Sequence, residues 1–73
     1  MLEVLTLFNC HLKTILENRG MSQAFLARKM GVSTQTMNAW VADRAVPSMK
    51  LAYKVAEFLE CDVSEIWEYK GRE

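Results

Sequence analysis

Few side chains of this chain could do acid–base or nucleophilic chemistry, and their spacing does not favour it. The single histidine, His11, follows Cys10 directly, and neighbouring residues on a helix do not face one another. The other cysteine, Cys61, has no second histidine to act as its base. A zinc site needs about four ligands, and the sequence offers neither that set nor a glycine-rich phosphate loop. We therefore expect no enzymatic activity, no bound metal and no cofactor.

A second group of side chains is better suited to reading hydrogen-bond patterns. Between residues 34 and 42, apolar residues recur at helical spacing, at Met37, Trp40 and Val41. The opposite face is uncharged, where exposed helices usually carry Lys or Glu, and consists of Thr34, Gln35, Asn38 and Ala39. Amide and hydroxyl groups of this kind can read the edges of DNA bases. The alternative is that these are ordinary surface residues.

The residues around this face predict two short helices joined by a tight turn, over residues 22–42. Ser22 is placed to cap the first helix, and Gly31 is placed to end it. Ser33 is placed to cap the second helix, and the small Ala27 would let the two helices cross closely. This pattern predicts a helix-turn-helix, although two helices of a plain bundle could have the same geometry.

The rest of the chain predicts three more helices and no strand. Gly20 ends the first of them, Ser48 caps the second after Pro47, and Ser64 caps the third. These helices cover residue 3 to Asn18, residue 48 to about Glu60, and residue 64 to about Tyr69. Residues 70–73 are expected to fray. The sequence thus indicates a compact all-α domain of five helices that occupies residues 1–73.

Length and composition limit what this domain can do alone. A chain of 73 residues buries only about 60% of its unfolded surface, so it is marginally stable and gains from a partner. No apolar run approaches the roughly 20 residues of a membrane span. The first residues lack the basic start of a secretory signal. We expect a cytoplasmic protein whose two cysteines stay reduced.

The net charge of zero hides an uneven distribution of charge. Residues 10–54 hold seven Lys or Arg against two acidic residues, whereas residues 55–73 hold six acidic residues against two basic ones. A basic body is consistent with a surface that meets nucleic-acid phosphates. A solvated surface with unevenly spread charges is the alternative.

These motifs resemble the lambda-repressor-like (Xre or Cro/CI-type) helix-turn-helix regulators of bacteria and phages. The matching segments are residues 22–27 (SQAFLA), 31–33 (GVS), Trp40, Pro47-Ser48 with Leu51, and Leu59 with 62–66 (DVSEI). The resemblance covers residues 9–68 and is specific, because separate segments match in register. The fold of this family has five helices, which agrees with the number predicted above.

The resemblance implies roles for individual residues. Base contacts in the major groove are implied for Thr34, Gln35, Asn38 and Ala39. Phosphate contacts are implied for the start of each helix and for basic residues after them, namely Ser22, Gln23, Ser33, Thr36, Arg44 and Lys50. The implied partner is double-stranded DNA.

The chain departs from the family pattern at three places. Residues 41–43 read Val-Ala-Asp where the family often has Glu-Asn-Gly, and Asp43 would repel phosphate unless it is turned away. Phe25 replaces a polar residue of the first helix of the motif. The base-facing surface also lacks Arg and Lys, so a charged fork for guanine is missing.

We therefore expect a sequence-specific DNA-binding transcriptional regulator that acts as a repressor. A reading surface with few charges binds weakly alone, so we expect a homodimer on a palindromic operator whose half-sites are about 34 Å apart. The predicted dimer contacts are Phe25, Trp67 and Tyr69, and a row formed by Val4, Leu7 and His11 is either extra core or a dimer seam. The alternative is a protein-interaction module, an antitoxin or anti-repressor partner, that uses the same residues to bind a regulatory protein and binds DNA weakly.

Overall fold

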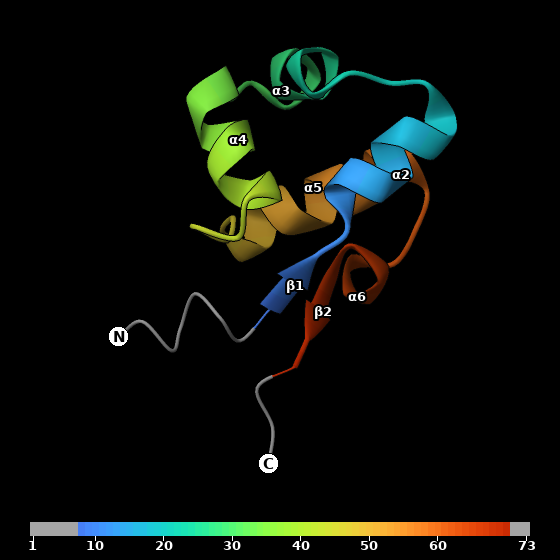
Figure 1. Cartoon of the computed structure of the whole chain (residues 1–73), viewed down its shortest axis with the longest axis vertical. Coiled ribbons are helices and arrows are strands. Elements are labelled where there is room, and N and C mark those ends of the chain that lie inside the picture. The colour runs from blue at the N-terminus through green and yellow to red at the C-terminus, as the bar shows by residue number, and fades with distance from the viewer. Residues whose placement is uncertain (1–7, 71–73) are drawn as a thin grey trace.

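Within the described part of the chain, five helices and one small sheet make up the fold. The computed structural model describes residues 8–70 (Figure 1). In chain order, the elements are β1 (Phe8–Cys10), α2 (Leu12–Arg19), α3 (Gln23–Met30), α4 (Thr34–Val41), α5 (Met49–Leu59), α6 (Val63–Ile66) and β2 (Trp67–Tyr69). The prediction of a five-helix, mostly helical fold is confirmed, and the sheet is a small addition to it.

The sheet is the main feature that the sequence did not predict. β1 pairs antiparallel with β2, so that Phe8 lies opposite Tyr69 and Cys10 lies opposite Trp67. The Phe8 and Tyr69 rings also pack together, with their centroids 5.4 Å apart. The two strands therefore join the beginning and the end of the described chain, side by side in Figure 1.

This pairing corrects two predicted helix boundaries. The first helix begins at Leu12, so the prediction of helix over residues 8–11 is wrong. The predicted helical residues 3–7, with Val4 and Leu7, lie outside the described residues. The last helix covers Val63–Ile66, with Asp62 in place of Ser64 at its N-cap, and β2 follows where helix was predicted to Tyr69. A short run of apolar residues is compatible with a strand or with a helix. Only pairing with a strand far away in the sequence decides which of the two forms.

The predicted caps of the longer helices are confirmed. Ser22, Ser33 and Ser48 each accept a hydrogen bond from the backbone N–H three residues later. Gly20 and Gly31 end α2 and α3 in the left-handed conformation, with φ of 66° and 76°. A side chain at these φ values would be strained, which explains why glycine ends both helices.

The core lies between the helices and is sealed by the two tryptophans. Trp40 of α4 meets Trp67 of β2 edge to face, with ring centroids 6.3 Å apart. The buried residues come from every helix and are Leu12, Leu16, Leu26, Ala27, Met30, Met37, Trp40, Val55, Ala56, Leu59, Ile66 and Trp67. Burial of each large aliphatic side chain contributes about 1.5–3 kcal/mol. Within this core, α3 packs on both α4 and α5. No helix among residues 8–70 is long and apolar enough to cross a membrane.

Candidate nucleic-acid interface

The predicted helix-turn-helix is formed by α3 and α4. After Gly31, the Val32 backbone N–H donates to the Ala27 carbonyl at 3.0 Å, which closes the end of α3. The chain then turns directly into α4, whose first residue follows the Ser33 cap. Figure 1 shows α4 at the edge of the molecule, with one side packed on the body and the other side open. The turn therefore sets the angle at which α4 is presented.

The outward face of α4 carries the predicted base-reading side chains. Thr34, Gln35 and Asn38 are exposed, and Ala39 is half-buried beside them. On the opposite side, Met37 and Trp40 are buried in the core. The structure thus brings the predicted base-contacting residues together on one surface. Their hydroxyl and amide groups can donate and accept hydrogen bonds at base edges, and the Ala39 methyl can pack on a thymine methyl.

A small hydroxyl network lies at the start of α4. The Thr36 backbone N–H donates to Ser33 Oγ at 3.0 Å, and Ser33 Oγ donates in turn to Thr36 Oγ1, also at 3.0 Å. The proton of the Thr36 hydroxyl is left to donate to a phosphate oxygen. Ser33 therefore orients Thr36 as well as capping the helix.

The start of α3 offers backbone donors. Ser22 caps this helix by accepting from the Phe25 N–H at 3.0 Å. Gln23, the first residue of α3, is half-buried, and Ser22 is exposed. The first amides of a helix have no partner within it and carry partial positive charge, which suits a phosphate.

Two basic side chains lie after α4. The Arg44 backbone N–H donates to the Ala39 carbonyl at 2.9 Å, so the loop that carries Arg44 is anchored to the end of α4. Lys50 lies in the first turn of α5. Both side chains are exposed, and neither pairs with a carboxylate of the described residues. They are free to approach phosphates.

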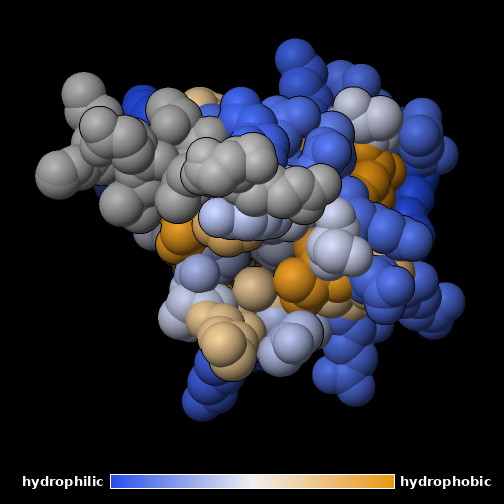
Figure 2. Space-filling view, turned by 90° about the horizontal axis from the view of Figure 1, so that it is seen from below, coloured by the Kyte–Doolittle hydropathy of each residue, from blue (hydrophilic) through white to orange (hydrophobic). Residues whose placement is uncertain are grey.

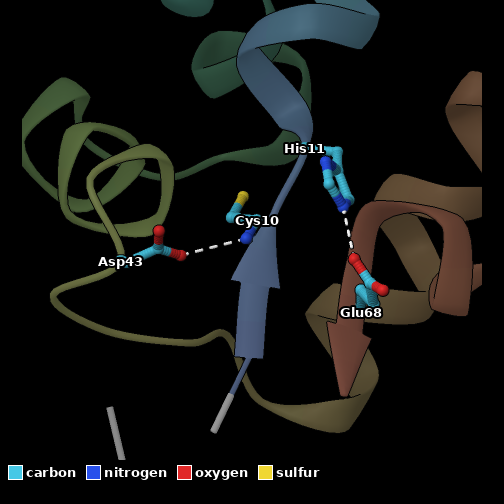
Figure 3. A network of polar contacts seen from close by, with 4 residues as sticks. All are labelled: Cys10, His11, Asp43 and Glu68. Atoms are coloured by element: carbon cyan, nitrogen blue, oxygen red, sulfur yellow. Dashed lines mark hydrogen bonds and ion pairs between the residues drawn. The ribbon is translucent and has the colours of Figure 1, made fainter. Parts of the chain in front are cut away.

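Asp43 does not join this surface, although it lies between α4 and Arg44. Its Oδ1 accepts a hydrogen bond from the Cys10 backbone N–H at 3.0 Å, and its φ of 63° turns the carboxylate toward β1 (Figure 3). The repulsion of phosphate considered from the sequence is therefore reduced. The sequence did not predict the hydrogen bond between Asp43 and the Cys10 backbone. The one local signal was the residue type, because Asp tolerates the left-handed conformation that is needed just after a helix.

A second polar contact ties β2 to the start of α2. His11 Nε2 lies 2.9 Å from Glu68 Oε1, and this hydrogen bond is the main reason why the pKa of Glu68 is lowered (Figure 3). The His11 backbone N–H also donates to the Ile66 carbonyl at 2.7 Å. His11 thus supports the sheet and lies apart from the α4 surface.

The residues predicted as dimer contacts do not form one surface. Phe25 packs on Phe58 of α5, and the Arg28 and Lys29 side chains lie over its ring. Trp67 is buried in the core, whereas Tyr69 is exposed on β2. In Figure 1, α3 and β2 lie at opposite ends of the molecule, so Phe25 is separated from Tyr69.

Neither cysteine is placed for chemistry with a base. Cys10 and Cys61 are free thiols. Burial, with a smaller contribution from the Asp43 carboxylate, raises the pKa of the Cys10 thiol to about 11, which disfavours the reactive thiolate. Within residues 8–70 no group of three His, Cys, Asp or Glu side chains could hold a metal ion.

Known proteins share this arrangement. A helix-turn-helix family model matches residues 12–66. An uncharacterized HTH-type transcriptional regulator of Methanocaldococcus jannaschii is 40% identical over 53 residues, which make up 73% of this chain and 80% of that protein. The crystal structure of a "putative DNA-binding protein" from Bacteroides fragilis matches with a TM-score of 0.76 and 28% identity, over 84% of this chain and 98% of that one.

The matched region contains the caps, the glycine turn and the exposed face of α4 described above. The chain therefore belongs to the lambda-repressor-like (Xre-type) family of helix-turn-helix DNA-binding transcriptional regulators.

Proposed function

We propose that this protein is a transcriptional repressor that binds a palindromic operator as a homodimer, with α4 in the major groove. The observation that carries the proposal is the outward face of α4. It is exposed, uncharged and rich in hydrogen-bonding groups, while its other side is fixed in the core by Met37 and Trp40. A rigid helix with such a face is suited to reading bases.

Base and phosphate contacts have separate roles in this proposal. Thr34, Gln35, Asn38 and Ala39 contact bases, and the Gln35 amide is suited to pair with adenine in a bidentate manner. Phosphate contacts fix the register of α4 on the duplex and come from both helix starts and the two basic residues, namely Ser22, Gln23, Ser33, Thr36, Arg44 and Lys50. The inward turn of Asp43 leaves Arg44 without a competing negative charge beside it.

The number of contacts favours two copies of the chain. One α4 reads only part of a groove, and no Arg or Lys strengthens its base contacts. A homodimer doubles the reading surface and places its half-sites about 34 Å apart, on the same side of the duplex. Operator binding requires no catalysis or cofactor, and it places the working protein with the DNA in the cytoplasm.

Selection of bound duplexes from a random pool, followed by gel-shift titration at rising salt, tests the proposal. We expect a palindromic consensus and an affinity that falls as salt rises. The double variant Gln35→Ala, Asn38→Ala should weaken binding at least about 30-fold, because two base contacts are lost and each costs about 1–3 kcal/mol. Thr14→Ala with Asn18→Ala is the matched control, because these exposed residues lie on α2, away from α4 in Figure 1.

The absence of any shift at micromolar protein in low salt would exclude DNA binding. The chain would then be a protein-interaction module, as an antitoxin or anti-repressor partner. The Phe25–Phe58 pair, with Arg28 and Lys29 over Phe25, favours this second function, because it offers aromatic and cationic surface to a regulatory protein.

A further inference from the structure

Two contacts tie the end of α4 to the small sheet. Trp40, in the last turn of α4, packs edge to face on Trp67 of β2, with ring centroids 6.3 Å apart. Asp43, just after the helix, accepts a hydrogen bond from the Cys10 backbone N–H of β1 at 3.0 Å (Figure 3). Cys10 and Trp67 lie opposite each other in the sheet. These four residues therefore form a closed ring of contacts that runs from α4 through both strands and back.

The turn that contains Asp43 is also bonded to the proposed DNA-reading residues. The Arg44 and Ala45 backbone N–H groups both donate to the Ala39 carbonyl, at 2.9 and 3.3 Å. Ala39 belongs to the proposed base contacts, and Arg44 belongs to the proposed phosphate contacts. A displacement of Asp43 would therefore move the last turn of α4 and the Arg44 backbone together.

The loop beyond Asp43 is not packed closely on the sheet. Its residues Val46 and Pro47 line an open apolar groove of about 300 Å³. The sheet and α5 supply its other walls, which include Phe8, Met49, Tyr53 and Trp67. Figure 2 shows this face of the molecule from below, with hydrophobic residues in its middle and hydrophilic residues at its rim. Close packing thus does not fix the loop on this side, which gives weight to the hydrogen bond of Asp43.

We propose that Asp43 is a positioning residue for base reading, because it holds the end of α4 and Arg44 in the orientation that the major groove requires. The inference rests on the proposed operator-binding function, in which α4 contacts bases. Asp43 itself does not contact DNA in this proposal, since its carboxylate points to β1 (Figure 3). It acts through the backbone on either side of it.

A helix keeps its tilt only if both of its ends are fixed. The first end of α4 is fixed by the turn after Gly31 and by the Ser33 cap, and the second end by Trp40 and Asp43. A helix of eight residues is about 12 Å long, so a shift of about 1 Å at one end tilts it by about 5°. Such a shift disturbs contacts that must be held within about 0.5 Å. Phosphate contacts that depend on charge tolerate it better.

Charge alone predicts the opposite effect. A carboxylate close to a phosphate-binding surface repels DNA, so its removal should strengthen binding to every sequence if Asp43 has no other role. If Asp43 positions α4, loss of its acceptor oxygen should instead weaken binding to the operator. The sign of the effect therefore separates the two roles.

Two substitutions that both remove the charge isolate the hydrogen bond. Asp43→Asn keeps an acceptor oxygen and Asp43→Gly keeps none, while Asn and Gly both tolerate the φ of 63° at this position. In gel-shift titrations on the selected operator, Asp43→Asn should bind at least as tightly as wild type. Asp43→Gly should bind about 5- to 10-fold more weakly than Asp43→Asn, as expected for the loss of one hydrogen bond. On random duplex the two variants should agree within about twofold.

Loss of stability needs a control of its own. Ile15→Ala shortens a partly buried side chain of α2 that packs against the core, and it leaves the four-residue ring in place. It should lower stability without changing operator affinity. All variants are compared at a temperature at which circular dichroism shows them to be folded.

Hydrogen exchange of the free protein tests the contact without DNA. After correction for intrinsic rates, the Arg44 and Ala45 amides should exchange at least about 5-fold faster in Asp43→Gly than in Asp43→Asn. The Cys61 amide makes the equivalent bond after α5, to the Ala56 carbonyl at 3.0 Å. It should exchange at the same rate in both variants.

The positioning role and the proposed function fail separately in these experiments. Equal operator affinities of Asp43→Asn and Asp43→Gly would overturn the positioning role, and so would an equal loss on operator and random duplex. Tighter binding of Asp43→Gly than of wild type to both duplexes would show that Asp43 only repels DNA. A wild type that shifts no duplex would overturn operator binding instead. Faster exchange in Asp43→Gly would then still show that Asp43 holds the end of α4, and equal exchange would overturn that too.

Discussion

The Asp43 carboxylate accepts a hydrogen bond from the Cys10 backbone N–H, with 3.0 Å between Oδ1 and N. The contact joins the residues just after α4 to β1, across 33 positions of sequence. It has two consequences. It turns a negative charge away from the surface proposed to meet DNA, and it couples the position of α4 to the small sheet.

This contact predicts how substitutions of Asp43 change stability. Asp43→Ala should lower the free energy of unfolding by about 2–3 kcal/mol, because it leaves the Cys10 N–H without its acceptor and puts alanine at a left-handed φ. Asp43→Asn should cost less, about 1 kcal/mol, since its amide oxygen can accept the same bond and Asn tolerates this conformation. Urea unfolding measures both. Equal stability of wild type and Asp43→Ala would show that the contact contributes nothing.

Arg44 should act on DNA affinity through charge alone. We expect Arg44→Gln to weaken binding to all sequences to a similar degree and to reduce the salt slope by about 1, because one phosphate contact is lost. Titrations at several salt concentrations, on operator and on random duplex, measure this slope. Arg19→Gln, at the end of α2, is the matched control and should leave the slope unchanged. A loss confined to the operator would instead assign Arg44 to base reading.

The two core tryptophans should differ in their tolerance of phenylalanine. Both are almost fully buried, but the indole N–H of Trp67 makes no full hydrogen bond among residues 8–70 and has only the Cys10 sulfur, a weak acceptor, near it. Trp67→Phe removes this unpaired donor, which offsets about 1–3 kcal/mol of the loss in packing. Trp67→Phe should therefore destabilise the fold less than Trp40→Phe, as measured by urea unfolding. The reverse order would indicate that the Trp67 N–H is paired in solution.

The raised pKa of Cys10, about 11, predicts slow thiol chemistry and a dependence of stability on pH. At pH 8, alkylation of Cys10 in the folded protein should be about 100-fold slower than in urea, because the thiolate fraction falls tenfold for each unit of pKa. The folded state favours the neutral thiol of Cys10, whereas the unfolded state allows the thiolate to form from about pH 9. The contribution of Cys10 to the stability of the folded state is therefore complete below pH 9 and is lost as the pH rises to 11. Mass spectrometry of labelled peptides measures the rate. Cys10→Ala should reduce the change in stability and leave the part that comes from Cys61, whose pKa burial also raises.

The helix-turn-helix could be predicted from sequence because its determinants are local. Ser22 and Ser33 each cap a helix through a bond to the third residue that follows, and Gly31 ends α3 within the same short segment. The exposed face of α4 follows from the spacing of Met37 and Trp40, which are buried on its other side. Each of these signals lies within a few residues of what it determines.

Other features depended on partners far away in the chain. The strand at Phe8–Cys10 needs β2 beside it, and His11 lies 57 positions from Glu68, so no local pattern could separate this strand from the start of α2. The direction of the Asp43 side chain depended on the place of the Cys10 N–H.

The sequence by itself therefore determined the number of helices, the caps at Ser22, Ser33 and Ser48, and the exposed, uncharged face of α4. Only the tertiary structure decided the sheet, the inward turn of Asp43 and the apolar groove beside Met49 and Tyr53. The physical reason is that helices and caps are stabilised by bonds between near neighbours. Strand pairing, side-chain direction and surface hollows depend instead on which distant residues the packed core brings together.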